Sequence, residues 1–96
     1  MRKETDQALL KALGAEVKAR RANLGISQEE LALRADVNRT FVGKIELAMN
    51  QPTLSVLLRL SEGLQTPLPE LIESVLKRKV KESGAGQKID PDSSKA

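Results

Sequence analysis

The chain of 96 residues contains no cysteine, histidine, tryptophan or tyrosine, and Phe41 is its one aromatic residue. Structural and catalytic zinc sites use thiolate or imidazole ligands, so they are excluded, as is a disulfide framework. Nucleophilic catalysis of the Ser-His-Asp or Cys-His kind lacks its base. Binding of single-stranded nucleic acid by aromatic stacking is disfavoured too. We therefore expect a protein that is not an enzyme and that holds no metal or cofactor.

Long apolar runs are also missing from the sequence. No stretch approaches the roughly 18 apolar residues that span a membrane. The opening MRKETDQ is too polar to lead into the apolar core of a signal peptide. A chain this short forms one domain. We expect a cytoplasmic, single-domain protein with no membrane partner and no small-molecule ligand.

The formal net charge of +3 is unevenly distributed along the chain. Residues 1–44 hold nine Lys/Arg and six Asp/Glu, residues 45–76 hold one and four, and residues 77–96 hold six and three. The basic surplus thus lies in the first half and in KRKVK at residues 77–81. Such a surplus fits either an anionic partner or a solvated face.

Apolar residues recur at helical spacing and no strand pattern appears, which predicts an all-α fold of five short helices. The first helix is expected over residues 8–24, with Gly25 as a left-handed terminator. Ser27 and Glu30 have the spacing of a capping box and begin the second helix.

The remaining helices are predicted from their N-caps. Asn38 is the natural cap of the third helix and Thr53 that of the fourth. Thr66 followed by Pro67 is typical of an N-cap with proline at the first helical position, and begins the fifth. We place the domain at residues 8–79. Residues 80–96 are Gly-, Ser- and Asp-rich and are interpreted as a flexible polar tail.

Small and apolar residues between residues 28 and 46 have the order of a helix-turn-helix. Its two helices cross closely, so the first needs a small residue in its second turn and fixed apolar positions lock the angle. The sequence supplies them as Leu31, Ala32, Ala35, the turn residue Asp36, Val37, Val42 and Ile45. Each is an ordinary core residue when taken alone. Their joint order in a basic half predicts DNA binding.

A family resemblance is carried by ISQEELALRADVNRTFVGKIELAMNQPTLSVLLRLSEGLQTPLPELI, within a match over about residues 13–72. It resembles the phage-repressor and Cro-like (Xre-type) helix-turn-helix family, most closely in SQEELA, RTFVGKIE and PTLSVLLRL. RTFVGKIE is also similar to the recognition helices of restriction–modification controller proteins. The resemblance implies a compact five-helix, lambda-repressor-like domain that binds double-stranded DNA.

The sequence departs from the family pattern at several positions. Asp36 stands where the turn glycine is usual, and it can still adopt the left-handed region. Arg20 replaces a leucine of the first helix, and Leu24 is expected to fill that space. Ala48 replaces the glycine after the third helix. A basic residue common nearby is replaced by Leu47, Met49 and Asn50, which puts backbone contacts from this loop in doubt.

The start of the third helix is expected to lie in the major groove, because a helix fits that groove and its first turn reaches base edges. The outward-facing candidates are Arg39, Thr40, Gly43 and Lys44. The planar guanidinium of Arg39 matches guanine O6 and N7. Thr40 offers a hydroxyl to a base edge or phosphate and a methyl to thymine, and Lys44 reaches guanine or phosphate. The alternative for Arg39 and Lys44 is a solvated charge.

Two residues of this helix have two interpretations each. Gly43 costs about 0.8 to 1 kcal/mol of helix stability relative to alanine, which points to close approach to DNA or to helix packing. Phe41 either packs partly into the core or lies at the groove edge. We favour partial exposure at the edge.

Phosphate contacts are expected from three further residues. Gln28 lies at the N-terminus of the second helix, where free N–H groups and the helix dipole attract anions. Asn38 is similarly placed, although capping explains it equally well. Asn50 is the third candidate. The resemblance also implies a salt bridge between Arg21 and Glu46, which we interpret as structural first.

A single helix-turn-helix touches few base pairs, so a homodimer on a palindromic operator is expected. The apolar stripe of the fifth helix offers the interface, through Leu68, Leu71, Ile72, Val75 and Leu76. The alternative is that this stripe only covers the domain's own core.

The sequence thus predicts a sequence-specific transcriptional regulator, either a dimeric repressor or a controller. Two alternatives stay open. One is a DNA-binding antitoxin of a toxin–antitoxin pair. The other is a helix-turn-helix used only as a protein-interaction module.

Overall fold

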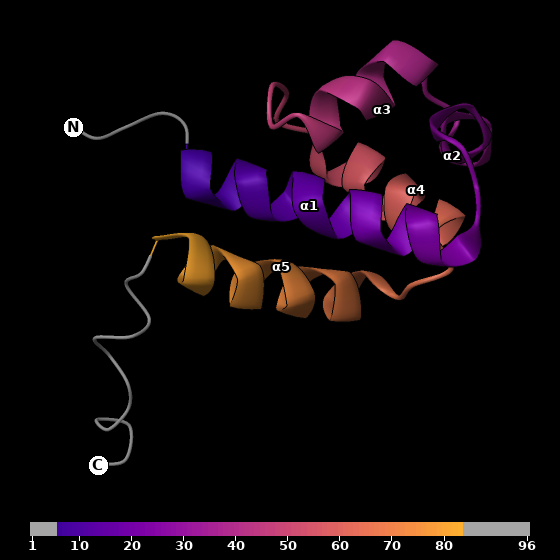
Figure 1. The fold of residues 1–96 in the computed structure, drawn as a ribbon. Helices are drawn as coiled ribbons and strands as arrows, with labels where there is room; N and C mark the ends of the chain where they lie inside the picture. Colours follow the sequence, from indigo (N-terminus) through magenta and orange to yellow (C-terminus); the bar gives the residue numbers. More distant parts are fainter. Residues whose placement is uncertain (1–5, 84–96) are drawn as a thin grey trace.

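A computed structural model describes residues 6–83, which form five helices and no strand. The helices are α1 (Gln7–Leu24), α2 (Gln28–Ala35), α3 (Arg39–Glu46), α4 (Leu54–Gly63) and α5 (Leu68–Ser83). Helix α1 lies between α3 and α5, and α4 packs on both α2 and α5 (Figure 1). The all-α, five-helix prediction is confirmed.

Local capping explains where four of the helices begin. The side chain of Asp6 accepts a hydrogen bond from the backbone N–H of Leu9 at the start of α1. Ser27, Asn38 and Thr53 cap α2, α3 and α4 in the same way, each accepting from the N–H three residues later. These three caps are those predicted, because a cap depends on one bond within one turn of helix.

The start of α5 differs from the prediction. The helix begins at Leu68, and the carbonyl of Pro67 accepts its first helical bond, from Leu71 N–H at 3.0 Å. Thr66 does not cap the helix. Its hydroxyl donates to the carbonyl of Leu64 at 3.2 Å and accepts from Nη1 of Arg20 at 3.1 Å. The Thr66 hydroxyl therefore binds Arg20 of α1 instead of a backbone N–H in the first turn of α5.

The far end of α5 also differs, since the helix continues to Ser83. The boundary at residues 79/80 is thus corrected for residues 80–83, which are helical. The rest of the predicted tail, residues 84–96, lies outside the described residues.

The core lies between the five helices, with α1 packed on α3 and α5 and α4 packed on α2 and α5. Its largest buried side chains come from every helix: Leu31, Ile45, Leu60, Leu64, Leu71, Val17, Val42 and Val75. The inner residues predicted for the helix-turn-helix, among them Ala32 and Ala35, belong to the same cluster. These contacts fix the position of α3 against α1 and α2.

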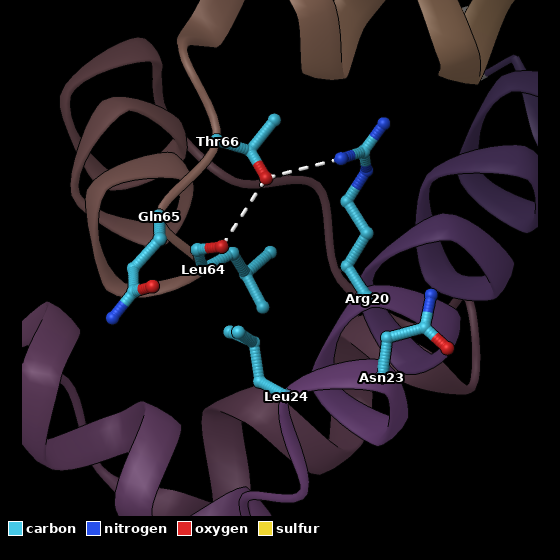
Figure 2. Close-up of a pocket in the computed structure, with 6 residues that line it drawn as sticks. All are labelled: Arg20, Asn23, Leu24, Leu64, Gln65 and Thr66. Carbon is cyan, nitrogen blue, oxygen red and sulfur yellow. Dashed lines mark hydrogen bonds between the residues drawn. The ribbon is translucent and has the colours of Figure 1, made fainter.

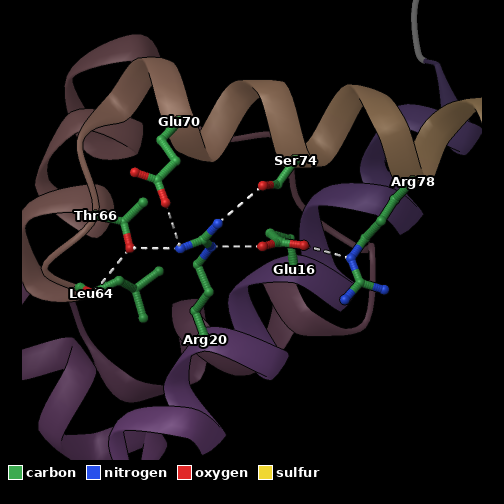
Figure 3. A network of polar contacts seen from close by, with 7 residues as sticks. All are labelled: Glu16, Arg20, Leu64, Thr66, Glu70, Ser74 and Arg78. Carbon is green, nitrogen blue, oxygen red and sulfur yellow. Dashed lines mark hydrogen bonds and ion pairs between the residues drawn. The ribbon is translucent and has the colours of Figure 1, made fainter.

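Arg20 is the centre of a polar network between α1 and α5 (Figure 3). Its Nε donates to Glu16 at 2.6 Å, and its Nη2 donates to Ser74 at 3.0 Å. Glu16 also accepts from Nε of Arg78, at 2.6 Å. Burial would raise the pKa of Glu16, but the hydrogen bonds from Arg78 and Arg20 lower it below its ordinary value. Polar pairing thus joins α1 to α5 where the family pattern has a leucine.

The expectation that Leu24 fills the space of that leucine is wrong. Leu24 is 37% exposed. It lies on the wall of an open pocket with Arg20, Asn23 and Thr66 (Figure 2). Because Arg20 itself extends to α5 and occupies this region, no apolar gap remains for Leu24 to fill.

Candidate nucleic-acid interface

The turn between α2 and α3 adopts the conformation expected of a helix-turn-helix. Asp36 has φ 59° and ψ 48°, so it takes the left-handed position in place of glycine. Its N–H donates to the carbonyl of Leu33, and Val37 N–H donates to that of Ala32 at 3.0 Å. The backbone groups at the end of α2 are thereby satisfied, and α3 begins two residues later.

Helix α3 presents one apolar and one polar side. Val42 and Ile45 are buried, while Arg39, Thr40 and Lys44 are exposed. Within residues 6–83 the last three side chains form no hydrogen bond or ion pair. The side of α3 that faces outward is therefore the one predicted, and its polar groups are available to a ligand. Their contacts with DNA stay a prediction.

Phe41 and Gly43 lie beside this polar side. Phe41 is partly buried and packs against the core, so it combines packing with partial exposure. A Cβ at Gly43 would approach Oε1 of Gln28 at 3.7 Å, an ordinary contact. Packing between α2 and α3 therefore does not require glycine here.

The predicted phosphate-binding residues have intramolecular roles as well. Gln28 donates from Nε2 to Glu46 at 3.0 Å, which joins the start of α2 to the end of α3. Oδ1 of Asn38 accepts from Phe41 N–H at 2.8 Å as the cap of α3. Asn50 is partly buried in the loop after α3. Gln28 and Asn38 thus contact α3 directly, and Asn50 follows it in the chain. Their contacts with phosphate stay a prediction.

Arg21 and Glu46 form the salt bridge that the resemblance implies. Nε of Arg21 lies 2.6 Å from Oε2 of Glu46, and Nη2 donates to Oε1 at 3.0 Å. The two side chains are 16% and 4% exposed. Nη1 of Arg21 also donates to the carbonyl of Ile26, at 3.0 Å. The pair therefore ties the end of α1 to both the loop before α2 and the end of α3.

Arg21 and Glu46 each favour the charged form of the other. Burial alone would raise the pKa of Glu46, but the hydrogen bonds from Arg21 and Gln28 hold it below its ordinary value. The hydrogen bond with Glu46 raises the pKa of Arg21. Both groups therefore stay charged across the neutral range.

Gly14 places α1 directly against α3, a role that was not predicted from the sequence. A Cβ there would lie 2.6 Å from the carbonyl oxygen of Ile45 and 2.8 Å from that of Glu46. Both neighbours are backbone atoms, so neither can rotate away. The one signal in the sequence is a glycine in the middle of a helix, where it costs stability. Which segment it meets depends on the helix crossing.

The dimer surface predicted on α5 is smaller than expected. Leu71 and Val75 are fully buried in the domain's own core, so they are corrected from interface to core residues. Leu68 and Ile72 are partly exposed, and Leu76 is 49% exposed. The apolar stripe of α5 contains both buried and exposed residues, because it is wider than the surface that α1 and α4 cover.

The basic run on α5 is largely neutralised within the molecule. Arg78 pairs with Glu16, and Lys77 lies 3.8 Å from Glu73. Lys79 pairs with Asp6 at 2.8 Å. These ion pairs leave less free charge on this part of the basic surplus for an anionic partner.

Residues 6–83 contain neither a cluster of metal-ligating side chains nor a membrane-spanning helix. In this part of the chain no group of three His, Cys, Asp or Glu side chains could hold a metal ion. None of its helices is both long and apolar enough to cross a membrane.

Comparison with known proteins finds similar sequences and folds among helix-turn-helix and controller proteins. A family model described as helix-turn-helix matches residues 17–71. The control protein C.SmaI of Serratia marcescens is 38% identical over 47 residues. That match covers 49% of this chain and 56% of the relative, so it spans little more than half of the relative's length.

Solved structures of restriction-modification controller proteins are similar over most of their length. C.AhdI from Aeromonas hydrophila is 31% identical with a TM-score of 0.63, and the match covers 65% of this chain and 94% of that one. The C.Esp1396I tetramer in complex with its natural 35 base-pair operator is 26% identical with a TM-score of 0.69. That match covers 75% of this chain and 95% of the other.

Proposed function

The chain belongs to the helix-turn-helix family whose model it matches over residues 17–71, and on this premise we propose that it is a sequence-specific transcriptional regulator. It binds double-stranded DNA as a homodimer and acts as a repressor or a controller. Because it acts on DNA, we place the protein in the cytoplasm. The proposal requires no catalytic step and no cofactor.

The outer side of α3 is the observation that carries this proposal. Arg39, Thr40 and Lys44 project from one side of a helix whose other side is fixed in the core. Their polar groups have no partner within residues 6–83. Base edges in the major groove offer acceptors to such side chains, and an α-helix fits that groove.

Selection of bound sequences from a random duplex library tests the proposal. We expect a palindromic consensus whose half-sites lie about 34 to 36 Å apart, one helical turn. Affinity should fall steeply as salt rises. Failure to enrich any sequence would favour a helix-turn-helix used only for protein interaction, and co-purification of a second small protein would favour an antitoxin.

Replacing Arg39 with alanine should weaken binding to the selected site by about 1 to 3 kcal/mol and relax specificity at one base pair. The reason is the loss of two hydrogen bonds to one guanine. Competition binding against every single-base variant of the site measures the effect. Lys81→Ala is the control, since Lys81 is exposed in the last turn of α5, outside the helix-turn-helix. An equal loss on every sequence would make Arg39 a phosphate contact.

A homodimer through α5 is supported by the apolar surface that the core leaves exposed. Ile72 lines an apolar hollow of about 140 Å³ between α1 and α5. Leu76, one turn later, is half-exposed. The C.Esp1396I controller is a tetramer on its operator, which supports self-association in a similar chain.

The dimer predicts a specific loss of association. In a two-fold interface each substitution acts twice, so Leu76→Lys should raise the dissociation constant about a hundredfold or more. Light scattering at micromolar concentration measures it. Leu33→Lys is the matched control, because Leu33 is exposed on α2 and far from α5 in the chain. A wild-type protein that is strictly monomeric at this concentration rejects the dimer.

A further inference from the structure

Within residues 6–83, most of the positive charge outside salt bridges lies on α1 and α3. In this part of the chain the basic side chains that form no salt bridge are Lys11, Lys18, Arg39, Lys44, Arg59 and Lys81, although Lys18 still interacts electrostatically with Glu46. Arg59 donates to the carbonyl of Ala35, and Lys81 is near the end of α5. The other four lie on α3 or on α1, the helix that packs against it.

Lys11 and Lys18 line an open hollow between α1 and the end of α3. The hollow has a volume of about 450 Å³ and is lined by Lys11, Ala15, Lys18, Glu46, Leu47 and Ala48. Seven residues separate the two lysines, so they lie on one side of α1, roughly 10 Å apart along its axis. Both are exposed, and the alanines between them leave room for a large anion to approach.

The acidic residue at this hollow does not neutralise the lysines. The Glu46 side chain is only 4% exposed, and its two oxygens already accept from Arg21 and Gln28. Its one negative charge is held mainly by Arg21 and also attracts Lys18. With Arg21 and both lysines around this single carboxylate, the hollow keeps a net positive charge.

The hollow begins where the outer side of α3 ends. Leu47 follows Lys44 by three residues and is 71% exposed, so it continues the row of Thr40 and Lys44. Helix α3 has eight residues and is about 12 Å long, comparable with the width of the major groove. If its first turn reaches the bases, its last turn must lie close to a phosphate backbone.

The position of the lysines relative to α3 is fixed. Gly14 lies between them in sequence and brings the backbone of α1 against the carbonyl of Ile45. The Arg21 to Glu46 ion pair holds the same two helices one to two turns further along. Figure 1 shows α1 running directly beneath α3. The lysines thus move with the recognition helix as one unit.

We propose that Lys11 and Lys18 bind the phosphate backbone of the same duplex, beyond the contacts made by α2 and α3. This inference rests on the proposed function and adds a sequence-independent clamp on α1 to it.

Salt dependence of binding tests the clamp directly. Each phosphate contact adds about 0.9 to the slope of log affinity against log salt. Lys11→Gln with Lys18→Gln should therefore lower the slope by about 1.8 per protomer. The affinity difference from wild type should therefore shrink by roughly tenfold for each protomer bound between 50 and 200 mM salt, or by roughly 150-fold for a dimer. The probes are the duplex selected by the wild-type protein and an unrelated duplex of equal length.

A matched variant separates a contact from a change in net charge. Lys77→Gln with Lys81→Gln removes the same charge from α5, and both residues are exposed there. We expect its slope to stay close to that of the wild type, with equal melting temperatures for both double variants. The ratio of affinities for the two duplexes should also be unchanged in the Lys11 and Lys18 variant.

Three results would overturn the inference. If the salt slope of the Lys11 and Lys18 variant is unchanged, the proposed regulator function stands but the clamp on α1 is rejected. An equal fall in both double variants shows a general effect of charge. Absence of salt-dependent duplex binding in the wild-type protein rejects the proposed function itself, and the clamp with it.

Discussion

Arg21→Ala is expected to lower the free energy of unfolding by about 3 to 5 kcal/mol. The substitution leaves the carboxylate of Glu46 buried, with Gln28 as its remaining hydrogen-bond donor from a side chain. An uncompensated buried charge costs more than the attraction of the original pair. For a domain of this size the melting temperature should fall by at least about 12 °C, which calorimetry measures.

A surface ion pair provides the control for Arg21→Ala. Lys77 pairs with Glu73 on α5 with both side chains mostly exposed, so Lys77→Ala should change stability by less than about 0.5 kcal/mol. Arg21→Met combined with Glu46→Leu should recover much of the loss, because no charge is then left unpaired. Melting of Arg21→Ala at the wild-type temperature would contradict a structural role for the pair.

The pH dependence of stability should change with the same substitution. The folded state lowers the pKa of Glu46, so the pair stabilises the fold above the ordinary pKa of glutamate, about 4.3. This stabilisation is lost as the pH falls through the lower folded value. In Arg21→Ala the hydrogen bonds and the charge of Arg21 are gone, and only the Gln28 hydrogen bond and the attraction of Lys18 still oppose the rise in the Glu46 pKa caused by burial. Less stability is therefore lost on acidification. Urea melts between pH 7 and pH 3 compare the two slopes.

Helix positions were predictable because they depend on local bonds and spacing. Ser27, Asn38 and Thr53 each need one acceptor oxygen three residues before the N–H that donates to it. The two inner residues of α3, Val42 and Ile45, follow from helical periodicity. The exposed side of α3 then follows by exclusion.

Contacts between distant segments were not predictable in this way. Thr66 has the sequence of a cap, yet it bonds Arg20 from a helix 46 residues earlier. The stripe on α5 shows which residues share a side, but not how far α1 and α4 cover it. Leu71 and Leu76 therefore looked alike and differ completely in burial. Lys11 and Lys18 could not be predicted as candidate phosphate contacts, because only the crossing of α1 and α3 places them beside the end of α3.

Gly14→Ala is the second substitution for which a large effect is expected. The new methyl group would lie 2.6 Å from the carbonyl oxygen of Ile45, closer than carbon and oxygen can approach without a shift of backbone. Overpacking costs about 1 to 3 kcal/mol, and two backbone neighbours place this site at the upper end. The gain in helix propensity from alanine, about 0.8 to 1 kcal/mol, only partly offsets it.

Gly43→Ala supplies the opposite expectation in the same structure. Its new methyl group meets only the Gln28 side chain at 3.7 Å, so helix propensity acts alone and stability should rise by about 0.8 to 1 kcal/mol. A lower melting temperature for Gly14→Ala and a higher one for Gly43→Ala would show that the space around each glycine decides the change in stability. Equal stabilisation by both substitutions would mean that α1 does not approach α3 as closely as Gly14 implies. Because the same approach holds Lys11 and Lys18 beside α3, Gly14→Ala should also weaken duplex binding at temperatures where the protein stays folded.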